Sequence, residues 1–327
     1  MISLPLRGCI VSRYNLVLLA GHLQGVVMYR PEHLAGGNSS RFPSWGLPMK
    51  HPMSVAPHPA SKIMYLAVLC ILSLTHTSAQ DDVRTIMQHS VDANRTDWQA
   101  APTYDYFERD EENGQTKIYE VIMILGSPYE RLVAVNGEPL TVDQQAAEQH
   151  KLDQVTARRQ QESSEQRVQR VSKYEKDRKR DQLLMNELVK AFDFKLLGQQ
   201  KLGAYNVYVL KATPRADYEP PNMEAQVLAG MEGRLWIDQS TFQWIKVEAR
   251  VVHPVSIEGF LARVEPGTHF ELEKMQVTNG VWLPQHFQMK SRAKIFFLFN
   301  HSTQADETYF DYHLSPSDGH GSFQGQH

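Results

Sequence analysis

Cysteine is scarce in this chain of 327 residues, which contains only Cys9 and Cys70. Two cysteines exclude a disulfide scaffold and a zinc site built from cysteines. A basic excess is also missing, since 34 basic side chains face 37 acidic ones, and this balance argues against a dedicated nucleic-acid binder. Apolar residues (42%) and charged residues (22%) have the proportions of a globular protein. Composition alone identifies no ligand and no reaction.

Familiar catalytic motifs are absent after residue 79. That region has no Gly-x-Ser-x-Gly, no His-Glu-x-x-His, no glycine-rich phosphate loop and no Cys-x-x-Cys. Of its nine histidines, His253 and His269 lie on or beside expected strands and are interpreted as surface residues. His313, His320 and His327 recur every seven residues, but their flexible segment would make a metal site weak. An acidic cluster lacks the spacing of a known calcium loop, so a solvated turn is favoured; its members are Asp105, Glu108, Asp110, Glu111 and Glu112. We expect no enzyme activity, no cofactor and no metal.

A secretory signal is indicated by the most apolar stretch of the chain. Residues 63–74 form an uncharged apolar run of 12 residues, where a membrane span needs roughly 20. Lys62 precedes this run, and Thr77 and Ala79 supply small residues for cleavage before Gln80. We therefore expect an exported, periplasmic protein without a transmembrane segment in its mature chain.

Met53 gives this signal a short n-region of conventional length. Residues 53–79 are then the signal peptide, and residues 1–52 are a leader that is disordered or results from the choice of start site. The remaining chain from residue 80 has no cysteine, and its 28 basic and 36 acidic side chains give a net charge of −8. Such a chain must fold on its apolar core alone, for which its length is sufficient.

Alternation of apolar and polar residues predicts a series of antiparallel hairpins after a short amphipathic helix near residues 81–91. One strand is expected to place four apolar residues on the same face: Ile245, Val247, Ala249 and Val251. This pattern indicates a sheet with one solvent-exposed face. The expected strands are 103–107, 116–127, 129–135, 195–198, 205–210, 233–238, 242–252, 260–264, 268–277, 281–289, 293–299 and 307–312. The fold class is therefore α+β and mainly antiparallel β, with one large curved sheet of about 10–11 strands and a disordered tail at 315–327.

The predicted sheet domain spans residues 80–314. A segment rich in charged residues, 143–192, interrupts it, and we call this segment the charged arm. Residues 143–181 contain ten basic and eight acidic side chains and no Gly or Pro. This composition predicts a long solvated helix or helical hairpin whose last turns dock onto the body. Its basic side chains are candidates for contact with a protein partner: Arg158, Arg159, Arg167 and Arg170.

Two strand patterns carry a resemblance to a known family. Residues 233–248 read aromatic, hydrophobic, Asp, short turn, then a strand with a basic residue, and a later strand follows a turn and ends in Leu283-Pro284. Together with the signal and the following helix, over residues 80–312, the chain resembles the LolA/LolB-like superfamily of periplasmic lipoprotein carriers. The charged arm departs from the shorter carriers of this family.

The resemblance implies an open half-barrel with helices on its concave side, which holds lipoprotein acyl chains or another lipid without covalent chemistry. The candidate groove residues are Trp236, Ile245, Val247, Phe270, Leu272, Trp282, Phe287 and Phe297. An alternative of a different class is an envelope sensor similar to RseB, whose charged arm binds a membrane-protein partner. Ligand identity, oligomeric state and the role of the charged arm stay open.

The predicted signal can be tested by N-terminal sequencing of the exported protein. We expect a mature chain that begins at Gln80, because the small residues at Thr77 and Ala79 mark this cleavage site. A mature chain that begins within residues 1–52 would contradict both the signal and the interpretation of the leader.

Overall fold

The structure is a computed structural model that describes residues 77–112, 114–222, 224–257, 262–295 and 299–316. The predicted leader, the signal peptide up to residue 76 and the tail from residue 317 lie outside the described residues. Within the described part of the chain, no helix is long and apolar enough to cross a membrane.

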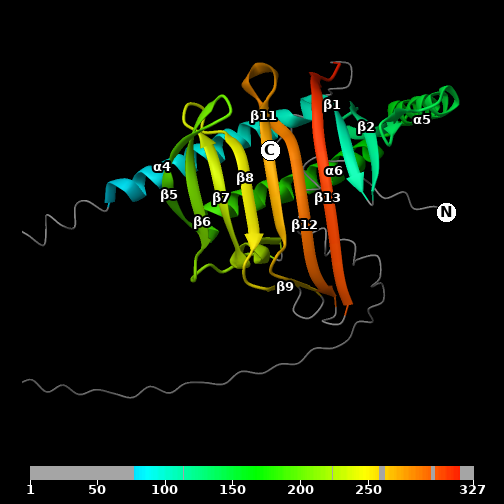
Figure 1. Cartoon of the computed structure of the whole chain (residues 1–327). Helices are drawn as coiled ribbons and strands as arrows, with labels where there is room; N and C mark the ends of the chain where they lie inside the picture. Colours follow the sequence, from blue (N-terminus) through cyan, green and yellow to red (C-terminus); the bar gives the residue numbers. More distant parts are fainter. Residues whose placement is uncertain (1–76, 113, 223, 258–261, 296–298, 317–327) are drawn as a thin grey trace, which may run out of the picture.

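One antiparallel sheet of thirteen strands dominates the molecule (Figure 1). Its order is β4-β3-β2-β1-β13-β12-β11-β8-β7-β6-β5, and β10 pairs with both β12 and β9. The strands are β1 Tyr104–Glu112, β2 Gln115–Ile124, β3 Ser127–Val135, β4 Glu138–Pro139, β5 Phe192–Leu202, β6 Tyr205–Pro214, β7 Met231–Asp238, β8 Trp244–Val251, β9 Val255–Ile257, β10 Ala262–Val264, β11 His269–Gln276, β12 Trp282–Ile295 and β13 Phe299–Leu314. The predicted α+β class with one large open sheet is confirmed. Two short strands, β4 and β9, were not expected, and β12 is one continuous strand where two, 281–289 and 293–299, were expected.

Tight turns set the register of the hairpins. Asn136 and Gly137 both have positive φ angles, 53° and 82°, as a two-residue turn between antiparallel strands requires. The ends of the sheet domain meet in the middle of the sheet, because β1 pairs with β13. The sheet stays open, with β4 and β5 as its edge strands, and the charged arm lies between these two strands in sequence.

A β-bulge in β8 corrects one prediction from the sequence. Opposite β7, Trp236 pairs with Lys246 and Ile237 pairs with Trp244, so Ile245 is the extra residue. A bulge shifts the alternation of side chains by one position. Trp244 therefore joins Val247 in one apolar cluster, while Ile245 packs in a separate cluster with Trp236. The expectation that Ile245 and Val247 share a face was wrong for this reason.

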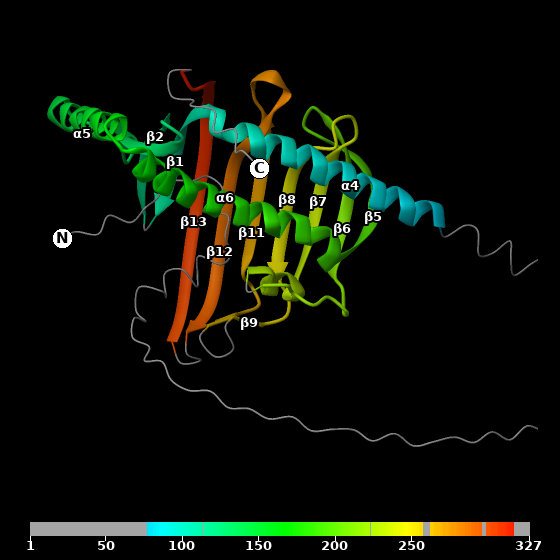
Figure 2. The same ribbon diagram turned by 180° about the vertical axis from the view of Figure 1, so that it is seen from behind.

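Among the described residues three α-helices accompany the sheet: α4 Thr77–Ala100, α5 Val142–Gln160 and α6 Ser164–Ala191. Short 3-10 helices occur at η1 Ala101–Thr103, η2 Glu224–Gly230 and η3 Thr278–Gly280. Figures 1 and 2 show α4 and α6 running across the same face of the sheet, which we call the inner face. Thr141 and Ser163 each form a capping box that starts a helix of the charged arm.

Apolar side chains explain why these helices lie there. Val83, Ile86 and Met87 of α4 are buried in the main core, and Leu184 and Leu188 of α6 pack against it. Their spacing of three and four residues forms one apolar stripe on each helix. The charged arm is thus only partly a solvated hairpin, because the second half of α6 covers the inner face. Helix α5 extends beyond the sheet at the side of β2 and β3 (Figure 1).

Two arginines fasten the charged arm to the turn between β2 and β3. Arg159 is buried and donates hydrogen bonds to the carbonyl oxygens of Ile124, Ser127 and Pro128 at 2.9, 2.7 and 3.0 Å. Burial, followed by the nearby Arg170, lowers the pKa of Arg159 to about 10, so it stays charged at neutral pH. Both arginines are engaged within the chain, since Arg170 contacts Glu162 as well as the same turn.

We expect Arg159→Met to lower the free energy of unfolding by about 3 kcal/mol, because three buried carbonyl groups lose a charged donor. Arg158→Met is the matched control, since its side chain is exposed on the same helix and should change stability by less than about 0.5 kcal/mol. Urea unfolding of the full chain measures both. Equal effects of the two substitutions would contradict the fastening role of Arg159.

Candidate functional site

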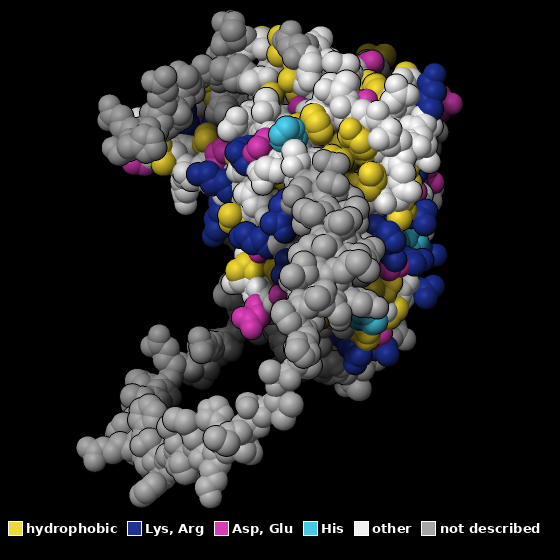
Figure 3. Space-filling model, turned by 90° about the vertical axis from the view of Figure 1, so that its left-hand side faces the viewer, with side chains coloured by type: hydrophobic (Ala, Val, Ile, Leu, Met, Phe, Trp, Pro, Cys, Tyr) yellow, Lys and Arg dark blue, Asp and Glu magenta, His cyan; other side chains and the backbone are white. Residues whose placement is uncertain are grey.

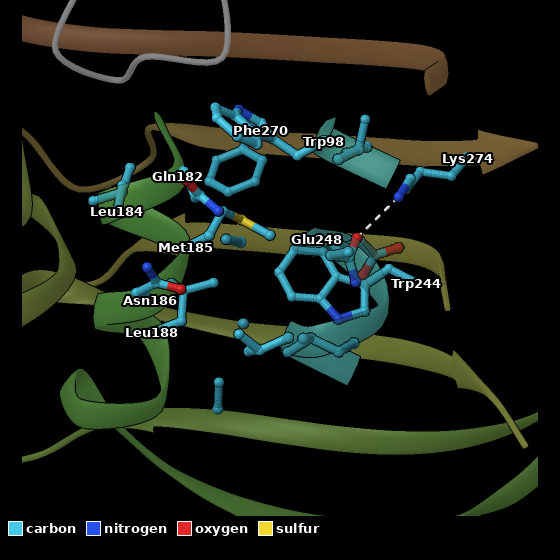
Figure 4. A pocket seen from close by; sticks show the side chains of 18 of the residues that line it. Trp98, Gln182, Leu184, Met185, Asn186, Leu188, Trp244, Glu248, Phe270 and Lys274 are labelled. Carbon is cyan, nitrogen blue, oxygen red and sulfur yellow. Dashed lines mark hydrogen bonds between the residues drawn. The ribbon is translucent and has the colours of Figure 1, made fainter. Parts of the chain in front are cut away.

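An apolar pocket of about 250 Å³ lies between the two helices and the inner face (Figure 4). Helix α4 contributes Val91 and Trp98, and α6 contributes Leu184, Met185 and Leu188. The sheet forms the floor, with side chains from β5 to β8, β11 and β12: Phe192, Phe194, Ala212, Met231, Leu235, Trp244, Val247, Phe270, Leu272 and Phe287. The helices thus cover the sheet without filling the space above it.

The structure divides the groove residues predicted from the sequence into two groups. Five of them line the pocket: Val247, Phe270, Leu272, Trp282 and Phe287. Trp236 and Ile245 do not line the pocket and lie in a cluster with Val207 and Val209 on the other face, which we call the outer face. Trp282 belongs to this cluster as well as to the pocket lining. Phe297 lies outside the described residues. Ligand contact at any of these positions stays a prediction.

Sequence reasoning missed the part of the pocket that comes from the helices. Trp98 and Met185 line it, and Figure 4 shows Met185 beside the aromatic ring of Phe270. The helical spacing of the apolar residues in α6 predicts that this segment packs against the body of the protein. No local sequence pattern identifies the surface that it contacts. Trp244 was missed because the bulge at Ile245 reverses the side on which it lies.

A buried ion pair lies at one end of the pocket. Lys274 of β11 donates hydrogen bonds to Asn94 Oδ1 and Asp97 Oδ2 of α4, each at 2.9 Å. The side chains of Lys274 and Asp97 are 8% and 5% exposed. Burial lowers the pKa of Lys274, and the carboxylate of Asp97 opposes that shift. The pair therefore places a charged donor at one end of a mostly apolar pocket, which Gln182, Asn186 and Glu248 also line (Figure 4).

This ion pair belongs to a polar network that docks α4 on the sheet. Asp97 Oδ1 accepts a hydrogen bond from the backbone N–H of Trp282 at 2.9 Å. Asn94 Nδ2 donates to the carbonyl oxygen of Ser90 at 2.8 Å, and the indole N–H of Trp244 donates to the hydroxyl of Ser90. Since buried polar groups lose free energy when unpaired, the network fixes the position of α4 over β8, β11 and β12.

The two helices are joined to each other at the same end of the pocket. The guanidinium of Arg178 in α6 lies 4.1 Å from the centre of the Trp98 ring, a cation–π contact. Arg178 also donates to the carbonyl oxygen of Trp98, and the indole N–H of Trp98 donates to the carbonyl oxygen of Arg178 at 3.2 Å. Trp98 is thus held from both sides while its ring lines the pocket.

The acidic cluster of β1 is not the solvated turn that the sequence favoured. Asp105, Glu108 and Asp110 are all buried. Asp105 accepts hydrogen bonds from the backbone N–H of Met123 at 2.7 Å and from the hydroxyl of Ser315, so it serves strand pairing. Among the described residues, no group of three or more His, Cys, Asp or Glu side chains is placed to hold a metal ion.

The remaining arginines proposed for partner contact are more accessible. Arg158 is exposed, and Arg167 is half-buried. On the side shown in Figure 3, Lys and Arg side chains gather in separate groups with acidic and apolar side chains between them. Partner binding by these side chains stays a prediction.

The buried pair gives a test of the network. Lys274→Met should lower the free energy of unfolding by about 3–5 kcal/mol, because it leaves the charge of Asp97 buried without a partner. The double variant Lys274→Met/Asp97→Asn should lose less than the sum of the two single variants. Lys290→Met, on an exposed position of β12, is the control and should stay within about 0.5 kcal/mol. Additive losses in a urea-unfolding cycle would disprove the pairing.

Comparisons with known proteins return structural neighbours only. No family model matches the chain, and no curated protein matches its sequence. The neighbours include a LolA superfamily protein from Nitrosomonas europaea (12% identity, 72% of this chain and 94% of that chain, TM-score 0.29). A domain assigned to outer-membrane lipoprotein sorting from Vibrio parahaemolyticus has 10% identity over 71% and 94% of the two chains, with a TM-score of 0.29. A DUF1329 family protein from Desulfovibrio piger has 8% identity over 72% and 94%, with a TM-score of 0.25. LolA superfamily proteins, which the sequence resembles, are thus among the structural neighbours of this chain.

Proposed function

We propose that this protein is an exported, non-enzymatic carrier that holds an acyl chain of a lipoprotein or lipid in the pocket between α4, α6 and the sheet. The observation that carries the proposal is the pocket itself, whose lining is almost entirely apolar. A soluble fold normally buries such surface in its own core. A space of this kind under two helices suits a flexible hydrocarbon chain.

The expected affinity of the pocket would allow an acyl chain to move between the membrane and the protein. Each methylene of an acyl chain that leaves water contributes about 0.8 kcal/mol, so ten methylenes contribute about 8 kcal/mol before the cost of association, which is at least about 4 kcal/mol. A bilayer offers the same hydrophobic contribution to the same chain. The exchange of one chain between membrane and pocket is therefore nearly balanced, which allows both uptake and release.

The charged arm distinguishes this protein from a simple carrier. An envelope sensor whose charged arm binds a protein partner was the alternative from the sequence. Arg159 and Arg170 are engaged with the turn between β2 and β3, and the second half of α6 covers the pocket. These contacts favour a role of the charged arm in forming the pocket, and we place the carrier first.

Filling the pocket should weaken ligand binding. Met185→Trp introduces a large ring from α6 into the space, and we expect the affinity for a C16 acyl chain with a fluorophore at its far end to fall at least tenfold. Leu183→Trp is the matched control, because Leu183 lies on the same helix with 56% of its surface exposed, and it should change the affinity less than twofold. Fluorescence titration of the full chain measures both.

Two results would count against the carrier. One is full-strength binding by Met185→Trp, which would place the acyl chain elsewhere on the protein. The other is an unaltered chain that neither binds the probe nor releases acyl-chain lipids on solvent extraction after purification.

A further inference from the structure

Lys274 offers the pocket more hydrogen-bond donors than the protein uses. An ammonium group carries three N–H donors. In the described part of the chain, two oxygens accept from Lys274 Nζ, one from Asn94 and one from Asp97. The side chain is more than nine-tenths buried, and it lines the apolar pocket. One N–H of this buried cation thus has no acceptor among the described residues.

The charge balance at this point selects which class of acceptor the pocket would take. Lys274 and Asp97 form an ion pair with no net charge. The other charged residues that line the pocket, Arg95, Glu232 and Glu248, are each paired with an opposite charge as well. A carboxylate that entered beside Lys274 and Asp97 would leave one negative charge unbalanced in a buried, apolar space, which is strongly unfavourable. A neutral carbonyl oxygen accepts the same hydrogen bond without that cost. An alkyl chain with no acceptor would leave the donor unused.

We propose that the remaining N–H of Lys274 binds the carbonyl oxygen of an acyl ester or amide, so that the pocket takes acylated lipids or proteins in preference to free fatty acids. The inference rests on the proposed function, since it assigns the polar end of the chain that the pocket holds. The hydrocarbon then extends from Lys274 between α6 and the sheet, toward Phe270 and Met185 (Figure 4). Asn94 and Asp97 act as positioning residues that orient the ammonium group.

Three ligands of similar length test the assignment: methyl laurate, laurate and tridecane. Trp98, Trp244 and Trp282 line the pocket, so their fluorescence reports binding to the full chain at pH 7.5. We expect the ester to bind within threefold of the alkane, because the hydrogen bond to Lys274 replaces the one lost to water. We expect laurate to bind at least tenfold more weakly than the ester.

The variant Lys274→Met/Asp97→Asn removes the donor and keeps the site neutral. It should weaken the ester at least tenfold and leave the alkane within twofold, while the control Lys290→Met alters neither. The comparison of the three ligands on the unaltered chain needs no variant, so the proposal remains testable if the double variant does not fold.

The outcomes separate this inference from the proposed function. An ester that binds the unaltered chain tenfold more weakly than the alkane, or laurate that binds more tightly than the ester, would overturn the role of Lys274 and leave an acyl-chain pocket in place. Failure of all three ligands to bind would overturn the proposed function, and this inference with it.

Discussion

The inner face of the sheet must be kept from water, and the rest of the structure follows from how this is done. A single open sheet has two faces, and its apolar side chains need a second layer. In the described part of the chain that layer consists mainly of two helices, α4 and α6, which cross the inner face (Figure 2), with Val227 and Leu228 of η2 beside them. Two helices shield the sheet but leave about 250 Å³ between them and its floor. The pocket is a consequence of this sparse covering.

Buried cations fix the helices that form this cover. Lys274 joins the sheet to α4, Arg178 joins α4 to α6, and Arg159 joins the charged arm to the turn between β2 and β3. Apolar contacts alone would allow the helices to slide, because dispersion and hydrophobic contacts are not directional. A buried cation has only a few acceptable partners, and a misplaced helix would leave it unpaired. The pocket can therefore keep its shape without an occupant.

Local patterns predicted the sheet well and the pocket in part. Alternation and turn residues such as Asn136-Gly137 mark hairpins because strand pairing between neighbours is a local property. The bulge at Ile245 has no such mark, so Trp236 and Ile245 were assigned to the groove although they pack on the outer face. Lys274 looked like one more charge on a strand, since its partners Asn94 and Asp97 lie about 180 positions earlier in the chain.

The central claim is that an acyl chain lies between α6 and the inner face of the sheet. Nuclear Overhauser effects between a uniformly ¹³C-labelled lauroyl ester and the full chain test it most directly. The account predicts cross-peaks from chain methylenes to the Met185 methyl group and the Trp244 indole, both of which line the pocket, and none to Trp236 on the outer face. Cross-peaks to Trp236 without any to Met185 would contradict it.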